Sequence, residues 1–168
     1  MKKWFCLCAA LILCVALSAC NSVTYPIDRE ALEQVVNVEL IEYYNPSQSE
    51  FTDWNAGRFY SLLPFDATSV TVLETLPYDE IPAFLDAFAE TDILMNHYVY
   101  DSPKDICLRL TYANGNYLII WSNYEGQNLI GYIGEYTIDG DVASYWGFFS
   151  RVSEFEKLVA KFFDYSLT

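Results

Sequence analysis

The stretch ICLRLTYANGNYLIIWS, residues 106–122, decides the fold because it predicts a β-hairpin. Two apolar runs flank Asn114-Gly115, and Asn-Gly between such runs is the strongest short signal for a hairpin turn. A two-residue type I′ turn there places on one face the apolar pairs Tyr112/Tyr117, Leu110/Ile119 and Leu108/Trp121. The other face is mixed, with the pairs Thr111/Leu118, Arg109/Ile120 and Cys107/Ser122. This register predicts one core face and one half-exposed face.

A second hairpin follows the first. Strands are expected at 129–137 and 142–149 on either side of Asp139-Gly140, another hairpin turn signal. Gly131 and Gly134 interrupt the first of these strands, which predicts a bulge or close packing under an aromatic ring. Residues 123–128, between the two hairpins, are expected to form a loop.

Further strands are predicted before the first hairpin. The segment 35–44 is rich in β-branched and aromatic residues and places Val36, Val38 and Leu40 on one face. Segments 69–76 and 94–100 are also expected to be strands, and 28–34 to form one or two helical turns. The stretch 48–68 shows no clear element, and so long a structureless loop is uncommon in a small domain.

Two amphipathic helices complete the pattern. Ile81, Phe84, Leu85 and Phe88 recur at helical spacing after two acidic residues. Near the C-terminus, Ser153 and Glu156 have the spacing of a capping box. The apolar stripe of this last helix is Phe155, Leu158, Val159, Phe162 and Phe163. The sequence therefore predicts a single α+β domain over residues 28–168, with a mainly antiparallel sheet of about five to seven strands and two helices on one face.

The N-terminal segment predicts export. Met1-Lys2-Lys3 is followed by an uncharged, mainly apolar run that ends in Ser18 and Ala19, as in a secretory signal peptide. The run is shorter than the roughly 20 residues of a spanning helix. The tetrapeptide Leu17-Ser18-Ala19-Cys20 resembles the lipobox of bacterial membrane lipoproteins at all four positions.

The lipobox resemblance implies a modified N-terminus. Residues 1–19 would be removed as a lipoprotein signal peptide, and Cys20 would carry a diacylglycerol with fatty acids such as palmitate. Residues 20–27 would then be the lipidated cysteine and a short tether. Two acyl chains hold a protein stably at a bilayer, whereas one holds it only marginally. The expected location is the extracytoplasmic surface of a bacterial membrane or envelope.

Charge and cysteine content narrow the function classes. The formal net charge is −14, and loss of Lys2 and Lys3 with the leader makes it −16. Such an acidic domain is not expected to bind nucleic acid. Acidity suits a cationic partner or calcium, but solubility at a crowded surface is the favoured explanation. With Cys20 lipidated and the leader removed, Cys107 is the one free thiol, so no intrachain disulfide is expected.

No catalytic, cofactor or metal motif is found. His97 is the only histidine, so no His/Cys zinc set exists. Asp139 and Asp141 lack the spaced acidic set of a calcium loop and are better explained by a hairpin turn. There is no G-x-S-x-G nucleophile elbow, and the glycines form no phosphate-binding loop. Cys107 lies within an apolar strand, which favours a buried, inert thiol.

Aromatic residues are the remaining binding candidates. Five of them gather in the C-terminal half and two lie in the unclassified stretch: Trp121, Tyr124, Tyr132, Tyr145, Trp146, Trp54 and Tyr60. Aromatic platforms bind sugars and peptides, but aromatic residues more often fill cores. We therefore expect most of this set to be structural.

Three functional hypotheses follow. The size, the Tyr-Ala-Asn-Gly-Asn-Tyr hairpin and the closing helix resemble small bacterial surface lipoproteins, a likeness that implies no particular activity. The first hypothesis is a lipid-anchored, non-enzymatic domain that binds a glycan, another ligand or a partner protein. The alternative is a small cell-envelope hydrolase that cleaves glycan or cell-wall material through Asp or Glu. The third is a purely structural or assembly role.

Overall fold

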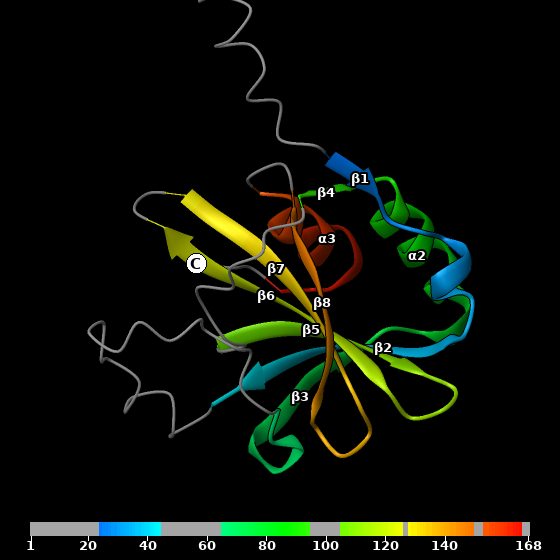
Figure 1. The fold of residues 1–168 in the computed structure, drawn as a ribbon, viewed down its shortest axis with the longest axis vertical. Helices are drawn as coiled ribbons and strands as arrows, with labels where there is room; N and C mark the ends of the chain where they lie inside the picture. The colour runs from blue at the N-terminus through cyan, green and yellow to red at the C-terminus, as the bar shows by residue number, and fades with distance from the viewer. Residues whose placement is uncertain (1–23, 45–64, 95–104, 126–127, 150–152, 166–168) are drawn as a thin grey trace, which may run out of the picture.

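The computed structural model describes residues 24–44, 65–94, 105–125, 128–149 and 153–165, among which it has eight strands, two α-helices and three short 3-10 helices (Figure 1). The strands are β1 (Thr24–Pro26), β2 (Val35–Tyr43), β3 (Val70–Thr75), β4 (Asp92–Leu94), β5 (Asp105–Tyr112), β6 (Tyr117–Glu125), β7 (Asn128–Tyr136) and β8 (Val142–Phe149). The helices are α2 (Ile81–Ala89) and α3 (Glu154–Phe162), with η1 (Glu30–Leu32), η3 (Ala67–Ser69) and η4 (Tyr78–Glu80).

The strands form one sheet in the order β1-β4-β8-β7-β6-β5-β2-β3. All described pairings are antiparallel, and β5 to β8 form a continuous meander across the middle of the sheet. The predicted α+β class is confirmed. The described sheet has one strand more than the predicted maximum, since residues 24–26, expected to belong to a tether, pair with β4 as β1.

The β5–β6 register differs from the prediction by one residue. Leu110 pairs with Leu118, and Cys107 pairs with Trp121. The turn contains three residues, because the Tyr112 amide donates to the Asn116 carbonyl oxygen at 2.8 Å and Gly115 has φ +88°. A three-residue hairpin turn with a left-handed third residue is a common alternative to the two-residue turn. Both faces of the hairpin carry fully buried side chains, Leu110 and Leu118 on one and Cys107 and Trp121 on the other, so the predicted half-exposed face was wrong.

The β7–β8 turn repeats this geometry. Thr137 donates its amide hydrogen to the Asp141 carbonyl oxygen at 2.8 Å, and Gly140 has φ +87°. The Gly140 carbonyl oxygen also accepts a hydrogen bond from the Phe65 amide at 2.8 Å. A Cβ atom at position 140 would overlap the Phe65 carbonyl oxygen. Glycine is therefore required here both by φ and by the close approach of another segment.

Other strand boundaries also required correction. The register of β2 against β5 shifts between Val35 and Asn37, so Val36 is the extra residue of a bulge. Val36 is exposed, and Val35 is buried in the place predicted for Val36. Residues 123–125 and 128 belong to β6 and β7 rather than to a loop. The strand expected at 94–100 begins earlier, as β4, and residues 95–100 lie outside the described part.

Both amphipathic helices are confirmed. Ile81, Phe84, Leu85 and Phe88 of α2 are buried, as the spacing predicted. In α3 the predicted apolar stripe is buried, with Phe162 only partly so. The predicted capping box is wrong, because Ser153 has a left-handed backbone (φ +76°) and its side chain makes no capping hydrogen bond. The amide of Lys157 instead bonds to the Ser153 carbonyl oxygen at 3.0 Å.

The two faces of the sheet carry separate apolar clusters. On the helix face, α2 and α3 pack over one side of the sheet (Figure 1) and share one cluster with Val38, Leu108 and Ile120. Gly131 lies beneath the Phe149 ring there, as its position in the strand predicted. On the opposite side, here called the tyrosine face, the cluster is Ile41, Tyr43, Phe65, Cys107, Tyr117, Ile119, Trp121, Tyr132 and Tyr136.

Candidate functional site

A groove beside η1, here called the Glu135 groove, brings together polar and aromatic side chains from four parts of the chain. Its volume is about 370 Å³, within the range of small-molecule sites. It is lined by Glu30, Ala31, Gln34, Tyr112, Asn114, Glu135 and Trp146. The amide of Ala113 donates to the Gln34 carbonyl oxygen at 2.9 Å, which ties the segment after η1 to the β5–β6 turn and so fixes one wall.

The Glu135 carboxylate is held in one orientation. Its Oε2 atom accepts hydrogen bonds from Ser144 Oγ at 2.7 Å and from Trp146 Nε1 at 3.1 Å. Ser144 is the cross-strand partner of Glu135 between β8 and β7. Both donors bond to Oε2. Oε1 makes no hydrogen bond among the described residues. The site therefore contains an oriented acceptor oxygen.

A β-bulge aims Trp146 at this carboxylate. Ile133 pairs with Gly147 and Gly134 pairs with Tyr145, so Trp146 is an extra residue in β8 with no partner in β7. Gly147, next in the chain, has φ +133°. Bulges re-aim side chains and are common beside functional sites. The Trp-Gly dipeptide is thus the local cause of the position of the Trp146 indole.

Tyr112 forms another wall of the groove. Its side chain is only 9% exposed, and its hydroxyl makes no hydrogen bond within the described residues. Burial, with a smaller contribution from the negative charge of Glu135, raises the pKa of the Tyr112 hydroxyl above its usual range. The hydroxyl therefore stays protonated at neutral pH and is available as a hydrogen-bond donor.

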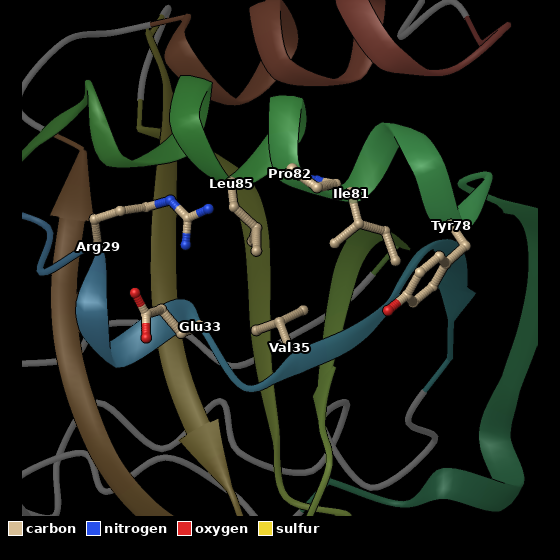
Figure 2. Close-up of a pocket in the computed structure, with 7 residues that line it drawn as sticks. All are labelled: Arg29, Glu33, Val35, Tyr78, Ile81, Pro82 and Leu85. Atoms are coloured by element: carbon tan, nitrogen blue, oxygen red, sulfur yellow. The ribbon is translucent and has the colours of Figure 1, made fainter.

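A second groove lies on the other side of η1, between η1 and α2 (Figure 2). It has a volume of about 360 Å³. Figure 2 shows Arg29 and Glu33 at one end and Tyr78 at the other, with Val35, Ile81 and Leu85 between them. Arg29 Nε is already paired with Asp86 Oδ1 at 2.8 Å, and Tyr78 is 80% exposed. Because its cation is engaged and its aromatic ring is not enclosed, this groove is the weaker candidate.

The tyrosine face holds buried polar atoms without partners. Tyr117 Oη, Tyr136 Oη and Trp121 Nε1 make no hydrogen bond within the described part of the chain. Burial raises the pKa of Tyr117 to about 12 and raises the pKa of Tyr136 further. At the edge of this face Arg109 and Glu39 form a half-buried ion pair, with Arg109 Nη2 2.7 Å from Glu39 Oε2. Nothing described here opens this cluster to a ligand.

The candidate residues named from the sequence lie in different environments in the structure. Trp121 and Tyr132 are buried, as expected for core aromatics, while Trp146 lines the Glu135 groove. Cys107 is fully buried, as predicted for an inert thiol. Asp139 and Asp141 flank the β7–β8 turn and are exposed, which confirms the hairpin interpretation. The rest lie outside what the structure describes: Cys20, Trp54, Tyr60, His97, and the side chains of Tyr124 and Tyr145.

Sequence reasoning missed Glu135 and Tyr112 as site residues. Tyr112 was noted only as part of the hairpin, Glu135 belongs to no motif, and the two come from non-adjacent strands. The available signal was the Trp146-Gly147 pair within a predicted strand, since glycine in a strand marks a bulge. Among the described residues, no group of three or more His, Cys, Asp and Glu side chains is arranged to hold a metal ion.

Neither the helices of the described residues nor comparison with known proteins identifies a function. No described helix combines the length and the apolar character needed to cross a membrane. Comparison with protein families, curated proteins and solved structures finds no match to this chain. The functional argument therefore depends on the Glu135 groove and on the N-terminal sequence.

Proposed function

We propose that this protein is a lipid-anchored, extracytoplasmic binding domain of bacteria whose Glu135 groove takes a small polar ligand such as a glycan unit. The observation that carries the proposal is the carboxylate of Glu135, oriented by Ser144 and Trp146 beside two aromatic walls. Ligand sites typically combine aromatic surface with a few placed polar groups. The amides of Gln34 and Asn114 add further hydrogen-bonding groups at the rim.

The anchor is supported by the lipobox resemblance of Leu17-Ser18-Ala19-Cys20. Its test is phase partitioning of the protein expressed in a bacterium with detergent extraction. The wild type is expected in the detergent phase, and Cys20→Ala in the aqueous phase, with Ser22→Ala as the matched control that stays in the detergent phase. Equal partitioning of wild type and Cys20→Ala would refute the anchor while leaving the groove proposal intact.

The binding role is tested on the full chain purified in a nonionic detergent. Thermal unfolding is followed with cell-wall fragments, glycan oligomers and short peptides. A ligand at about a hundred times its dissociation constant adds about 2.7 kcal/mol to the free energy of unfolding. The shift in melting temperature should disappear in Trp146→Leu and persist in Tyr78→Leu, which changes the other groove. A shift retained in Trp146→Leu would exclude the Glu135 groove.

A hydrolase is the second candidate, and one observation favours it. Glu30 and Glu135 line the same groove, and glycoside hydrolysis uses two carboxylates, one as acid and one as base or nucleophile. The assay is release of reducing ends from cell-wall glycan by the wild type, Glu30→Gln and Glu135→Gln. Turnover abolished in both variants would establish the enzyme. Binding without turnover in the wild type would favour the non-enzymatic role.

A further inference from the structure

The charged groups of the Glu135 groove have one sign. Its two charged lining residues, Glu30 and Glu135, are both acidic. The described ion pairs join Arg29 to Asp86, Arg109 to Glu39 and Lys157 to Glu154, so none of them neutralises Glu135. A carboxylate is most stable when an opposite charge lies within reach. The groove thus presents an uncompensated negative charge to whatever enters it.

The hydrogen bonds to Glu135 are both from neutral donors. Ser144 and Trp146 orient Oε2 without cancelling its charge. Oε1 is left with no donor in the described part of the chain, so an incoming donor has a defined acceptor. A charged donor gains more than a neutral one, because charge-assisted hydrogen bonds are roughly twice as strong.

Tyr112 supplies a second polar group for a ligand. The residue is about nine-tenths buried and lines the groove, and its hydroxyl has no hydrogen-bond partner among the described residues. The hydroxyl oxygen is not one of the fully buried unpartnered atoms of the described residues, so a ligand in the groove can reach it. A ligand oxygen seated beside Glu135 would accept from this hydroxyl while a nearby ligand cation contacts the carboxylate.

The aromatic walls suit the rest of such a ligand. The Trp146 indole donates through its edge to Glu135, which places the ring beside the carboxylate. Carbon atoms next to an ammonium group carry partial positive charge and pack well on aromatic faces. The formal net charge of −14 also attracts cations to the molecule as a whole.

We propose that the Glu135 groove recognises an ammonium-bearing ligand, with the ammonium group on the Glu135 carboxylate, a ligand oxygen on the Tyr112 hydroxyl and the carbon skeleton against Trp146. This inference deepens the proposed binding role and depends on it. It names the ligand class: an amine-bearing sugar or comparable small amine, in preference to a neutral glycan or an anion.

The test compares two probes that differ at their amino groups, which are free and cationic in one and acetylated and neutral in the other. The full chain in nonionic detergent is titrated calorimetrically with a glucosamine tetramer and with its N-acetylated counterpart, at about pH 6 so that the free amines are protonated. We expect the glucosamine tetramer to bind at least tenfold more tightly, and this preference to fall as salt is raised. Such a difference corresponds to about 1.4 kcal/mol.

Variants locate the effect. Glu135→Gln keeps a carbonyl oxygen for Ser144 and Trp146, so it should fold, and it should lose the charge preference. Glu33→Gln, in the second groove, is the matched control and should retain it. Tyr112→Phe should weaken both probes several-fold while leaving their ratio unchanged.

The outcomes separate the two levels of the proposal. Equal binding of the two probes, or tighter binding of the N-acetylated one, overturns the ammonium inference and leaves a binding role for the groove. A charge preference that survives Glu135→Gln also overturns it, since the cation must then bind elsewhere. If neither probe binds, the ammonium inference is overturned. The proposed function would still be supported if a different ligand bound the wild type and did not bind Trp146→Leu.

Discussion

The two faces of the sheet bury side chains of different chemistry. The helix face is closed by α2 and α3 and packs aliphatic residues with phenylalanines, such as Phe88 against Phe149 at a ring separation of 6.0 Å. The tyrosine face packs hydroxyl-bearing rings, with Tyr117 and Tyr136 stacked at 5.9 Å. The three buried polar atoms without partners that the structure describes all belong to the tyrosine face.

This difference teaches that burial and stabilisation are separate properties. A buried ring on either face gains from leaving water. A buried hydroxyl without a partner, however, costs about 1–3 kcal/mol of desolvation. The helix face is therefore expected to contribute more stability per buried residue. On the tyrosine face, removal of an unpartnered hydroxyl is expected to increase stability. Four substitutions or conditions test this comparison.

The largest expected effect is on the helix face. Phe88→Ala removes a fully buried ring that contacts Phe84 and Phe149. The free energy of unfolding should fall by about 3–5 kcal/mol, measured by urea denaturation. Tyr78→Ala, at an aromatic residue that is 80% exposed, is the control and should change it by less than about 0.5 kcal/mol. If Phe88→Ala lowered the free energy of unfolding no more than Tyr78→Ala does, the assignment of Phe88 to the core would be contradicted.

The next effect concerns the turn that supports the tyrosine face. Gly140→Ala introduces a Cβ atom against the Phe65 carbonyl oxygen at φ +87°, and should cost about 2–3 kcal/mol. Gly115→Ala is the matched control, with φ +88° but with its Cβ atom meeting only the Ile138 side chain, 2.6 Å from Cδ1. Its cost should be closer to the backbone strain alone, about 1–2 kcal/mol. Equal losses would show that the contact with Phe65 is not rigid.

A smaller effect of opposite sign is expected within the tyrosine face. Tyr136→Phe removes a buried hydroxyl without a partner and should raise the free energy of unfolding by about 1 kcal/mol or more. Tyr43→Phe is the control, because Tyr43 Oη accepts a hydrogen bond from the Asp66 amide at 3.1 Å. That variant should be destabilised. Destabilisation of Tyr136→Phe would mean that its hydroxyl is satisfied by a group beyond the described residues.

The smallest effect is a dependence on alkaline pH. Burial raises the pKa of Tyr117 to about 12, above the unfolded value of about 10. Its contribution to stability is therefore complete below pH 10 and is lost as pH rises toward 12, by about 1 kcal/mol at pH 11. Urea denaturation at pH 8 and pH 11 should show a smaller loss in Tyr117→Phe than in the wild type. Parallel losses in the two proteins would indicate that Tyr117 ionises equally in the folded and unfolded states.

The elements that the sequence predicted are those specified by local patterns. The α2 helix follows from the spacing of Ile81, Phe84, Leu85 and Phe88, which needs no distant partner. Both hairpins were located by their glycines. The register of β5 against β6 was not, because Asn114-Gly115 fits either a two-residue or a three-residue turn, and the choice depends on which side chains the rest of the fold can bury.

The candidate site was less predictable for the same reason. Trp146 was recognised as a possible binding aromatic, but Glu135 is one of 23 acidic residues and nothing in its neighbourhood distinguishes it. It acquires its role through the bulge that brings the Trp146 indole to its carboxylate. Tyr112 likewise meets Glu30 and Gln34 in the groove although they lie far from it in the sequence. Such long-range arrangements leave no local pattern.

The meander of β5 to β8 has a consequence for how quickly the chain folds. Its strands join through short turns, and Asn116 of the first turn accepts a hydrogen bond from the Ile138 amide of the second at 3.2 Å. The Arg109–Glu39 pair, in contrast, closes a separation of 70 residues. Local contacts form before distant ones because loop closure costs entropy. We therefore expect the meander to form the folding nucleus. In stopped-flow measurements, substitutions at its turns should slow folding, whereas substitutions in β3 should chiefly speed unfolding.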